Sequence, residues 1–138
     1  MRRMPDAHEP GPGDSTALKG KRGLRRLMNA TRYSIDGFAA AWRHESAFRQ
    51  ELLGCAVLVP VAILLPVTAV EKVLLIGSLL LVLLVELLNT AVEAAVDRDS
   101  VRIDPLGKRA KDYGSAAVTI VLMIAGMTWV TIHGSHYL

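Results

Sequence analysis

Four polar residues with regular spacing lie in or directly after the longest apolar stretch of the chain, residues 73–96. Glu86, Asn89, Glu93 and Asp97 stand at positions i, i+3, i+7 and i+11. In an α-helix with about 100° per residue, the four side chains fall within about 80° of one another. A rise of about 1.5 Å per residue makes this stripe about 16 Å long. The spacing therefore predicts a column of three carboxylates and one amide on a single helix face.

Carboxylates inside an apolar helix are costly if they face lipid, so these side chains should face protein, a metal ion or water. One interpretation is that they only bond to one another or to adjacent helices, as amides often do. Carboxylates also need a cation or a proton, and no Lys or Arg lies in the interior of the apolar stretches. We therefore predict a functional role for Glu86 and Glu93. Asp97 lies near the end of the stretch and could also be simply solvated.

Other charged residues are expected at the same depth. Glu45 falls where the apolar stripe of Phe38 and Trp42 would next require an apolar residue, which suggests an inward-facing ligand. Lys111 and Asp112 stand at the head of the third apolar stretch, although Lys111 could instead be only an anchor at the membrane surface.

Carboxylate and amide oxygens suit Mg²⁺, which proteins usually hold with one or two carboxylates plus substrate phosphates. An intramembrane carboxylate such as Glu86 could act as a general base. The sequence contains neither GxxxxGK[ST] nor GxGxxG, so any nucleotide would be held without the two common phosphate-binding loops. The residues alone predict a metal-dependent site that works at the bilayer surface.

The elements that position these residues are membrane-spanning helices. Of the 138 residues 51% are hydrophobic, and the apolar excess lies in three stretches. Each is long enough, with its flanking residues or some thinning of the bilayer, to cross about 30 Å of hydrocarbon. We predict an all-α membrane protein with spans at about 51–67, 71–97 and 110–133. The single cysteine, Cys55, cannot form an intrachain disulfide and is predicted to be a packing residue.

The N-terminal part is predicted to lie outside the hydrocarbon. Residues 1–22 are rich in Pro and Gly and read as a flexible tail, followed by a membrane domain over residues 23–138. Apolar residues at steps of three or four predict an amphipathic surface helix at about 24–50, with Arg residues off its apolar stripe. This arrangement argues against nucleic acid as the partner of the Arg cluster.

The distribution of basic residues predicts the topology. Ten of the 16 Lys and Arg residues lie between Arg2 and Arg49, five lie between Arg98 and Lys111, and only Lys72 lies between the first two spans. By the positive-inside rule the N-terminus and the loop before the third span are cytoplasmic.

Three blocks of sequence resemble one known family. Residues 86–97, ELLNTAVEAAVD, are similar to the signature E-x-x-N-[ST]-A-x-E-x-x-x-D of the prokaryotic diacylglycerol kinase family. AAWRHESAFRQE at 40–51 and RAKDYGSAA at 109–117 resemble two other blocks of that family. The similarity covers roughly residues 23–135 in the same order and spacing.

The resemblance implies a homotrimer of three-span subunits in the bacterial cytoplasmic membrane, which uses MgATP to phosphorylate diacylglycerol to phosphatidic acid at the cytoplasmic face. It implies that Glu86 is the general base and that Glu45 and Glu93 hold the metal ion on the ATP phosphates. It assigns supporting roles to Asn89 and Asp97. The implied ATP contacts are Arg26, Tyr33, Glu45, Glu93, Lys111 and Asp112, and the implied lipid contacts are Arg26, Ser34, Trp42, Ala47, Glu51, Glu86 and Ser115.

Three other functions remain as alternatives. Some members of the same family phosphorylate undecaprenol, although Gly114-Ser115-Ala116-Ala117 is more similar to the diacylglycerol branch. A small proton-coupled transporter subunit would also use intramembrane carboxylates, but here no comparable groups continue to the outer face. A purely structural membrane subunit would explain the apolar spans but not the stripe of acids.

Overall fold

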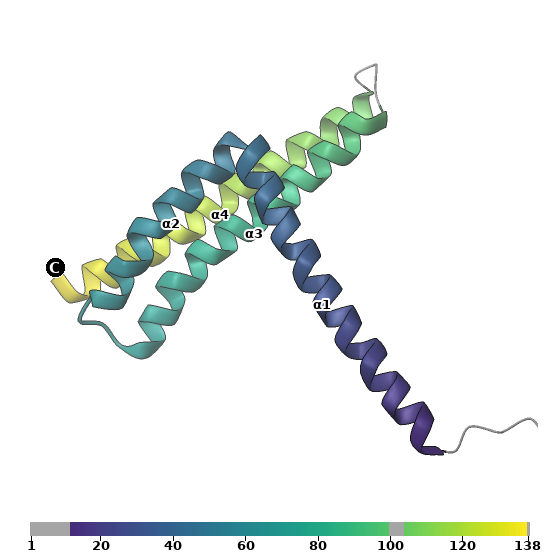
Figure 1. Ribbon diagram of the computed structural model, residues 1–138. Coiled ribbons are helices and arrows are strands. Elements are labelled where there is room, and N and C mark those ends of the chain that lie inside the picture. Colours follow the sequence, from purple (N-terminus) through teal and green to yellow (C-terminus); the bar gives the residue numbers. More distant parts are fainter. Residues whose placement is uncertain (1–11, 100–103, 138) are drawn as a thin grey trace, which may run out of the picture. The chain divides into compact units, whose positions relative to one another are not determined.

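The described part of the chain is entirely helical. The computed structural model describes residues 12–99 and 104–137, and these contain four α-helices and no strand (Figure 1). The helices are α1 (Pro12–His44), α2 (Ser46–Leu64), α3 (Ala69–Asp99) and α4 (Pro105–Tyr137). Three of them, α2, α3 and α4, are long and apolar enough to cross a membrane. The predicted all-α class with three spans is confirmed.

Helix α1 begins and ends earlier than predicted. It starts at Pro12 instead of near residue 24, and it ends at His44 instead of near residue 50. The helix-breaking residues concentrate before residue 14, and a proline is tolerated in the first turn because its missing N–H would have no helical partner there. Residues 1–11, the rest of the predicted tail, lie outside the described residues. Up to Ala39 the chain forms a compact unit of its own, separate from Ala40–Leu138.

A single extended residue separates α1 from α2. Glu45 has φ −112° and ψ 112°, and its side chain makes no capping hydrogen bond to α2. Its backbone N–H donates to the carbonyl of Ala41 at 2.9 Å, and its carbonyl accepts from the N–H of Arg49 at 3.3 Å. The Arg49 guanidinium donates to the carbonyl of Trp42 at 3.0 Å, at the end of α1. The first span therefore begins at Ser46, five residues before its predicted start.

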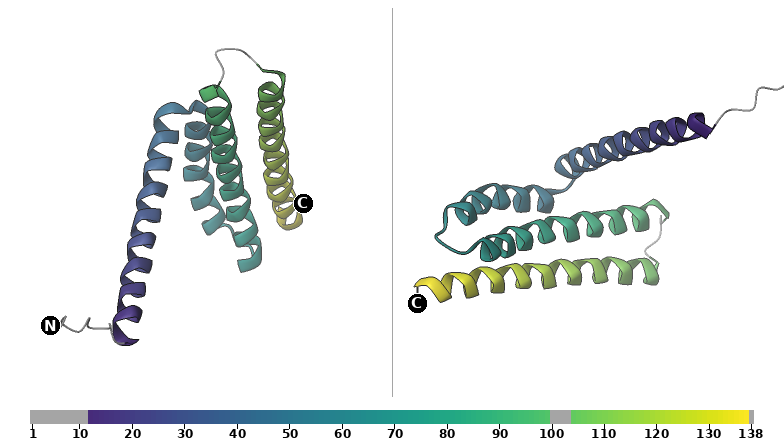
Figure 2. Two further views of the ribbon diagram at one scale, coloured as in Figure 1. Left: turned by 90° about the vertical axis from the view of Figure 1, so that its right-hand side faces the viewer. Right: turned by 90° about the horizontal axis from the view of Figure 1, so that it is seen from below.

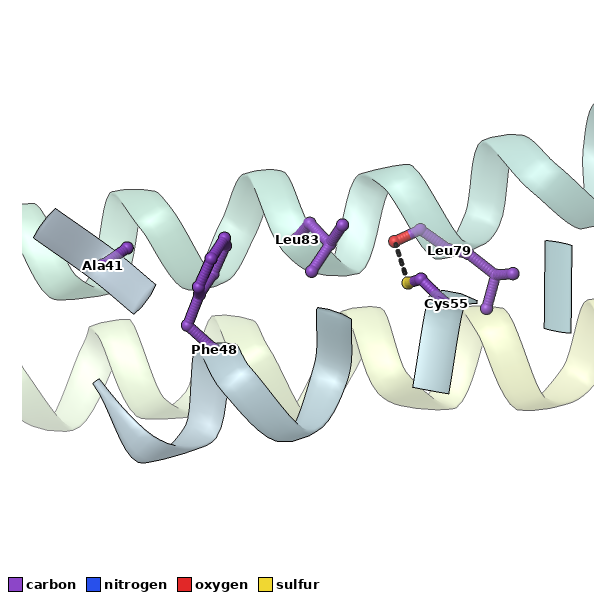
Figure 3. Close-up of a cluster of buried hydrophobic side chains, with 5 residues drawn as sticks. All are labelled: Ala41, Phe48, Cys55, Leu79 and Leu83. Atoms are coloured by element: carbon purple, nitrogen blue, oxygen red, sulfur yellow. Dashed lines mark hydrogen bonds between the residues drawn. The ribbon is translucent and has the colours of Figure 1, made fainter. Parts of the chain in front are cut away.

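Helices α2, α3 and α4 run side by side in alternating directions (Figure 2). Helix α3 packs against both α2 and α4. Its buried residues recur at steps of three or four, which defines one inward face of the helix. Three clusters fill the contacts of this face: Ala41, Phe48, Cys55, Leu79 and Leu83 (Figure 3); Ala62, Leu75 and Ile132; and Val82, Val121 and Ala125.

The first of these clusters contains the single cysteine. Cys55 is buried, and its Sγ donates a weak hydrogen bond to the carbonyl of Leu79 at 3.8 Å (Figure 3). The predicted packing role of Cys55 is confirmed. Large apolar side chains on the opposite faces of the three helices are exposed, as expected where the solvent is lipid.

Side chains cap the first turns of α3 and α4. Thr68 and Glu71 form a capping box at the start of α3: the Thr68 N–H donates to Glu71 Oε2 at 2.8 Å, and the Glu71 N–H donates to Thr68 Oγ1 at 3.3 Å. Asp104 caps α4 by accepting from the Gly107 N–H at 3.3 Å. With Pro105 in the favourable first helical position, α4 begins five residues before the predicted start at 110.

Candidate active site

The stripe predicted on α3 lies on the helix face that packs into the bundle. Glu86 is only 4% exposed and continues the row of buried Leu79 and Val82. Asn89 and Glu93 are partly buried, and Asp97 is exposed at the end of the helix. The column of polar groups therefore runs from the interior of the bundle to its surface.

Three helices place polar groups around one pocket of about 270 Å³. The stripe contributes Glu86, Asn89 and Glu93 from α3. Glu45, the extended residue between α1 and α2, lines the same pocket. The other residues that line the pocket are Ser46, Ala47, Ser115 and Val118.

The electrostatics of this pocket are dominated by negative charge. Glu86 interacts electrostatically with Glu45 and Glu93, and Glu51 interacts with Glu86. No Lys or Arg is among the residues that line the pocket. Carboxylates gathered in this way require a cation, or protons, to be stable in a partly buried place.

The amide of Asn89 contacts one of the carboxylates that line this pocket. Its Nδ2 donates to Glu93 Oε1 at 3.1 Å, which holds one carboxylate of the pocket in place. Its Oδ1 is buried and has no hydrogen-bond partner among the described residues. The same is true of Glu51 Oε2 on α2. A buried oxygen without a partner is costly, so each of these atoms requires a ligand or a structural reason for its place.

A second pocket, of about 320 Å³, lies where α3 ends and α4 begins. Lys111 Nζ lies 2.9 and 3.1 Å from the two carboxylate oxygens of Asp97, and Lys108 Nζ lies 2.7 Å from Asp112 Oδ2. Lys111 also interacts electrostatically with Glu93, which lines the first pocket. The residues that line the second pocket are Val96, Asp97, Asp104, Gly107, Lys108, Lys111 and Asp112.

The structure thus groups most of the predicted site residues. Six of them line the first pocket: Glu45, Ala47, Glu86, Asn89, Glu93 and Ser115. Three line the second: Asp97, Lys111 and Asp112.

The other predicted residues line neither pocket. Arg26, Tyr33 and Ser34 are exposed on α1, within the separate N-terminal unit. Trp42 is exposed in the last turn of α1, and Glu51 is partly buried on α2.

Sequence reasoning missed several residues that line the pockets. Ser46 and Val118 line the first pocket, and Lys108 lines the second. Val118 stands seven residues after Lys111 and three before the buried Val121, so the helical period of α4 is a signal that could have identified it. The family resemblance pointed to no role for these three residues.

The described residues contain no group of three or more His, Cys, Asp or Glu side chains arranged to hold a metal ion by themselves. A structural, fully protein-coordinated metal site is thus not formed in this part of the chain. The carboxylates of Glu45 and Glu93 line one pocket, which is a donor set suited to a hard cation that also takes ligands from a substrate.

Fold and pockets together define a class of protein: a small helical membrane protein with a polar, acid-rich pocket between its three apolar helices. Residues 32–133 match the prokaryotic diacylglycerol kinase family. The chain belongs to this family.

Curated relatives support the same assignment. The chain is 54% identical to a diacylglycerol kinase of Pseudomonas aeruginosa over 115 residues, which cover 83% of this chain and 94% of the relative. It is 46% identical to a diacylglycerol kinase of Escherichia coli K12, again over 83% of this chain and 94% of the relative. A diacylglycerol kinase of Helicobacter pylori 26695 is 40% identical over 78% of this chain and 84% of its own length.

Proposed function

We propose that this protein is an ATP-dependent lipid kinase that converts diacylglycerol to phosphatidic acid. The observation that carries the proposal is the pocket in which Glu45, Glu86, Asn89 and Glu93 meet between three apolar helices. The names of the relatives and the family support the reaction and the lipid substrate. They do not favour undecaprenol or a transported proton as the substrate.

The reaction is a direct transfer. The free hydroxyl of diacylglycerol attacks the γ-phosphorus of ATP, a new O–P bond forms, and the bond from that phosphorus to the β–γ bridging oxygen breaks as ADP leaves. Glu86 accepts the proton of the hydroxyl and later releases it to water. Glu86 suits this role because it is the most deeply buried carboxylate of the pocket.

The remaining polar residues bind and orient the reactants. Glu45 and Glu93 would hold Mg²⁺, which when bound neutralises phosphate charge. The pocket fits this ion because its carboxylates have no cationic partner among the residues that line it and do not complete a protein cage. Asn89 would orient Glu93 through their hydrogen bond, and Asp97 would hold the Lys111 ammonium group through their ion pair. Lys111 and Asp112 would contact ATP.

The residues of α1 and the start of α2 would complete the binding of both substrates. We assign Arg26 and Tyr33 to ATP, on the exposed surface of α1. Arg26 would also contact the lipid. The other lipid contacts of the proposal are Ser34, Trp42, Ala47, Glu51 and Ser115.

The protein is further proposed to be a homotrimer in the cytoplasmic membrane. The sites are completed in a homotrimer, since one subunit offers few surfaces to cover both pockets. The protein lies in the cytoplasmic membrane of a bacterium, with the N-terminus and both pockets at the cytoplasmic side, as the distribution of Lys and Arg favours.

The experiment is a phosphate-transfer assay with the purified full chain and radiolabelled ATP. Diacylglycerol and undecaprenol are offered separately in mixed micelles. The proposal requires faster formation of phosphatidic acid than of undecaprenyl phosphate. The reverse preference would assign the chain to undecaprenol, and transfer to neither lipid would contradict the kinase assignment.

A further inference from the structure

Helix α4 approaches α3 very closely at Gly114. A Cβ atom at this position would overlap Asn89 Oδ1, and it would lie 3.2 Å from Asn89 Cγ and 3.8 Å from Asn89 Cα. The amide oxygen of Asn89 therefore occupies the space that any side chain at position 114 would need. This contact also accounts for the buried Oδ1 without a hydrogen-bond partner, since the oxygen faces the Cα–H of Gly114, which is at most a weak donor.

The contact fixes the orientation of a residue of the pocket. With Oδ1 against Gly114, the other end of the amide, Nδ2, donates to Glu93 Oε1 at 3.1 Å. A side chain at position 114 would displace the amide or push α4 away from α3. Either movement would break or lengthen the hydrogen bond that holds Glu93.

Four other glycines of the spans do not have this relationship. A Cβ at Gly54, Gly77 or Gly126 would meet nothing within 4 Å. At Gly107 it would lie 2.9 Å from Cγ1 of Val96, an apolar contact that a general packing role explains. Gly114 alone among these five meets a polar side chain of the first pocket.

We propose that Gly114 is a positioning residue for phosphoryl transfer. Because it has no side chain, it leaves room for the Oδ1 end of the Asn89 amide. The amide is thereby held with Nδ2 directed to the Glu93 carboxylate, which it orients. The proposal rests on the proposed kinase function, in which Glu93 binds the metal ion on ATP. Small displacements of groups that orient reactants can lower turnover by about a hundredfold. We expect Gly114→Ala to lower kcat by about 10- to 100-fold and to raise the Mg²⁺ concentration needed for half-maximal activity.

The matched control is Gly126→Ala on the same helix. Both changes replace Gly with Ala inside α4, so they share the intrinsic gain in helix propensity, but only residue 114 has a neighbour to displace. We expect Gly126→Ala to keep the kcat and the Mg²⁺ dependence of the original protein, with an unfolding temperature that is equal or slightly higher because of the gain in helix propensity.

A double-mutant cycle with Asn89→Ala tests whether Gly114 acts through Asn89. Thermal unfolding of the full chain in detergent is measured for the original protein, both single variants and the double variant, in parallel with lipid phosphorylation. Gly114→Ala should lower the unfolding temperature when Asn89 is present. It should cost nothing further, in stability or in residual kcat, when residue 89 is alanine, because the overlapping amide is then absent.

Two results would overturn the proposal. One is an unchanged kcat and Mg²⁺ titration in Gly114→Ala. The other is a loss of stability from Gly114→Ala that is equal in the original protein and in the Asn89→Ala variant, which would make residue 114 a packing position without a specific link to Asn89. If the original protein transfers no phosphate to diacylglycerol, the proposed function fails, whereas the stability cycle still tests the contact between Gly114 and Asn89.

Discussion

Lys111 on α4 and Asp97 on α3 form an ion pair, with Nζ 2.9 and 3.1 Å from the two carboxylate oxygens. The pair joins the two helices at the pocket near the loop between them. The side chains are 38% and 63% exposed, so the pair is expected to contribute little to stability. Its importance should therefore lie in where it holds the Lys111 ammonium group.

Asp97→Asn tests this positioning role. Without the carboxylate, Lys111 loses the partner that orients it, and we expect the KM for ATP to rise by about 3- to 10-fold, as for a lost charged contact. The unfolding temperature should change little because the pair is exposed. Steady-state kinetics with ATP varied, together with a thermal scan, measures both. A large loss of stability with an unchanged KM would show that the pair is structural.

Glu86→Gln tests the general base. The amide keeps the size of the side chain but cannot accept the hydroxyl proton, so we expect kcat to fall by at least about a hundredfold with ATP binding largely kept. Glu71→Gln is the matched control, because Glu71 is on the same helix at its other end and glutamine can replace glutamate in a capping box. Near-normal turnover of Glu86→Gln would exclude the base assignment.

The proposed metal role of Glu45 and Glu93 predicts a shift in Mg²⁺ dependence. Activity should disappear when a chelator removes the divalent ion. Glu45→Gln and Glu93→Gln should each raise the Mg²⁺ concentration required, because each removes a hard anionic ligand. Titration of activity with Mg²⁺ at saturating lipid gives the shift. Titrations that match the original protein in both variants would remove these two residues from the metal role.

The proposed trimer predicts complementation between inactive subunits. If a site takes Glu86 from one chain and Lys111 from another, mixing Glu86→Gln with Lys111→Ala subunits should restore part of the activity. The mixture is prepared by unfolding and reassembling both variants together, with each variant treated alone as the control. A fully active monomer in detergent, identified by its mass in solution, would contradict the proposed assembly.

His136 provides a prediction about stability alone. Its Nε2 lies 3.0 Å from Glu71 Oε1, which connects the end of α4 to the start of α3 at the side of the bundle away from the pockets. We expect His136→Ala to lower the unfolding temperature slightly, because one exposed hydrogen bond between the two helices is lost, with kcat unchanged. A thermal scan that matches the original protein would show that this contact adds nothing.

The length and period of local patterns made the main features of the chain predictable from its sequence. The three spans follow from apolar length, and the stripe from Glu86 to Asp97 follows from helical spacing, since residues three or four apart share a face in any helix. The boundaries were less predictable. Pro12 and Pro105 begin helices that the sequence predicts to start only at about residues 24 and 110. Proline interrupts a helix interior but is accommodated in a first turn, so it can stand inside a helix start that a pattern of apolar residues does not reveal.

Only the tertiary structure decided which residues meet. A helix pattern identifies an inward face but not the partner opposite each residue, which depends on the register between helices that are distant in sequence. The packing of α4 on α3 places Gly114 against Asn89 and brings Ser115 to the pocket of Glu86. Glu45 has an extended backbone that no local propensity indicated, and it lines the same pocket. The sequence by itself determined a membrane protein with a polar stripe, and the packing of three helices turned that stripe into a pocket.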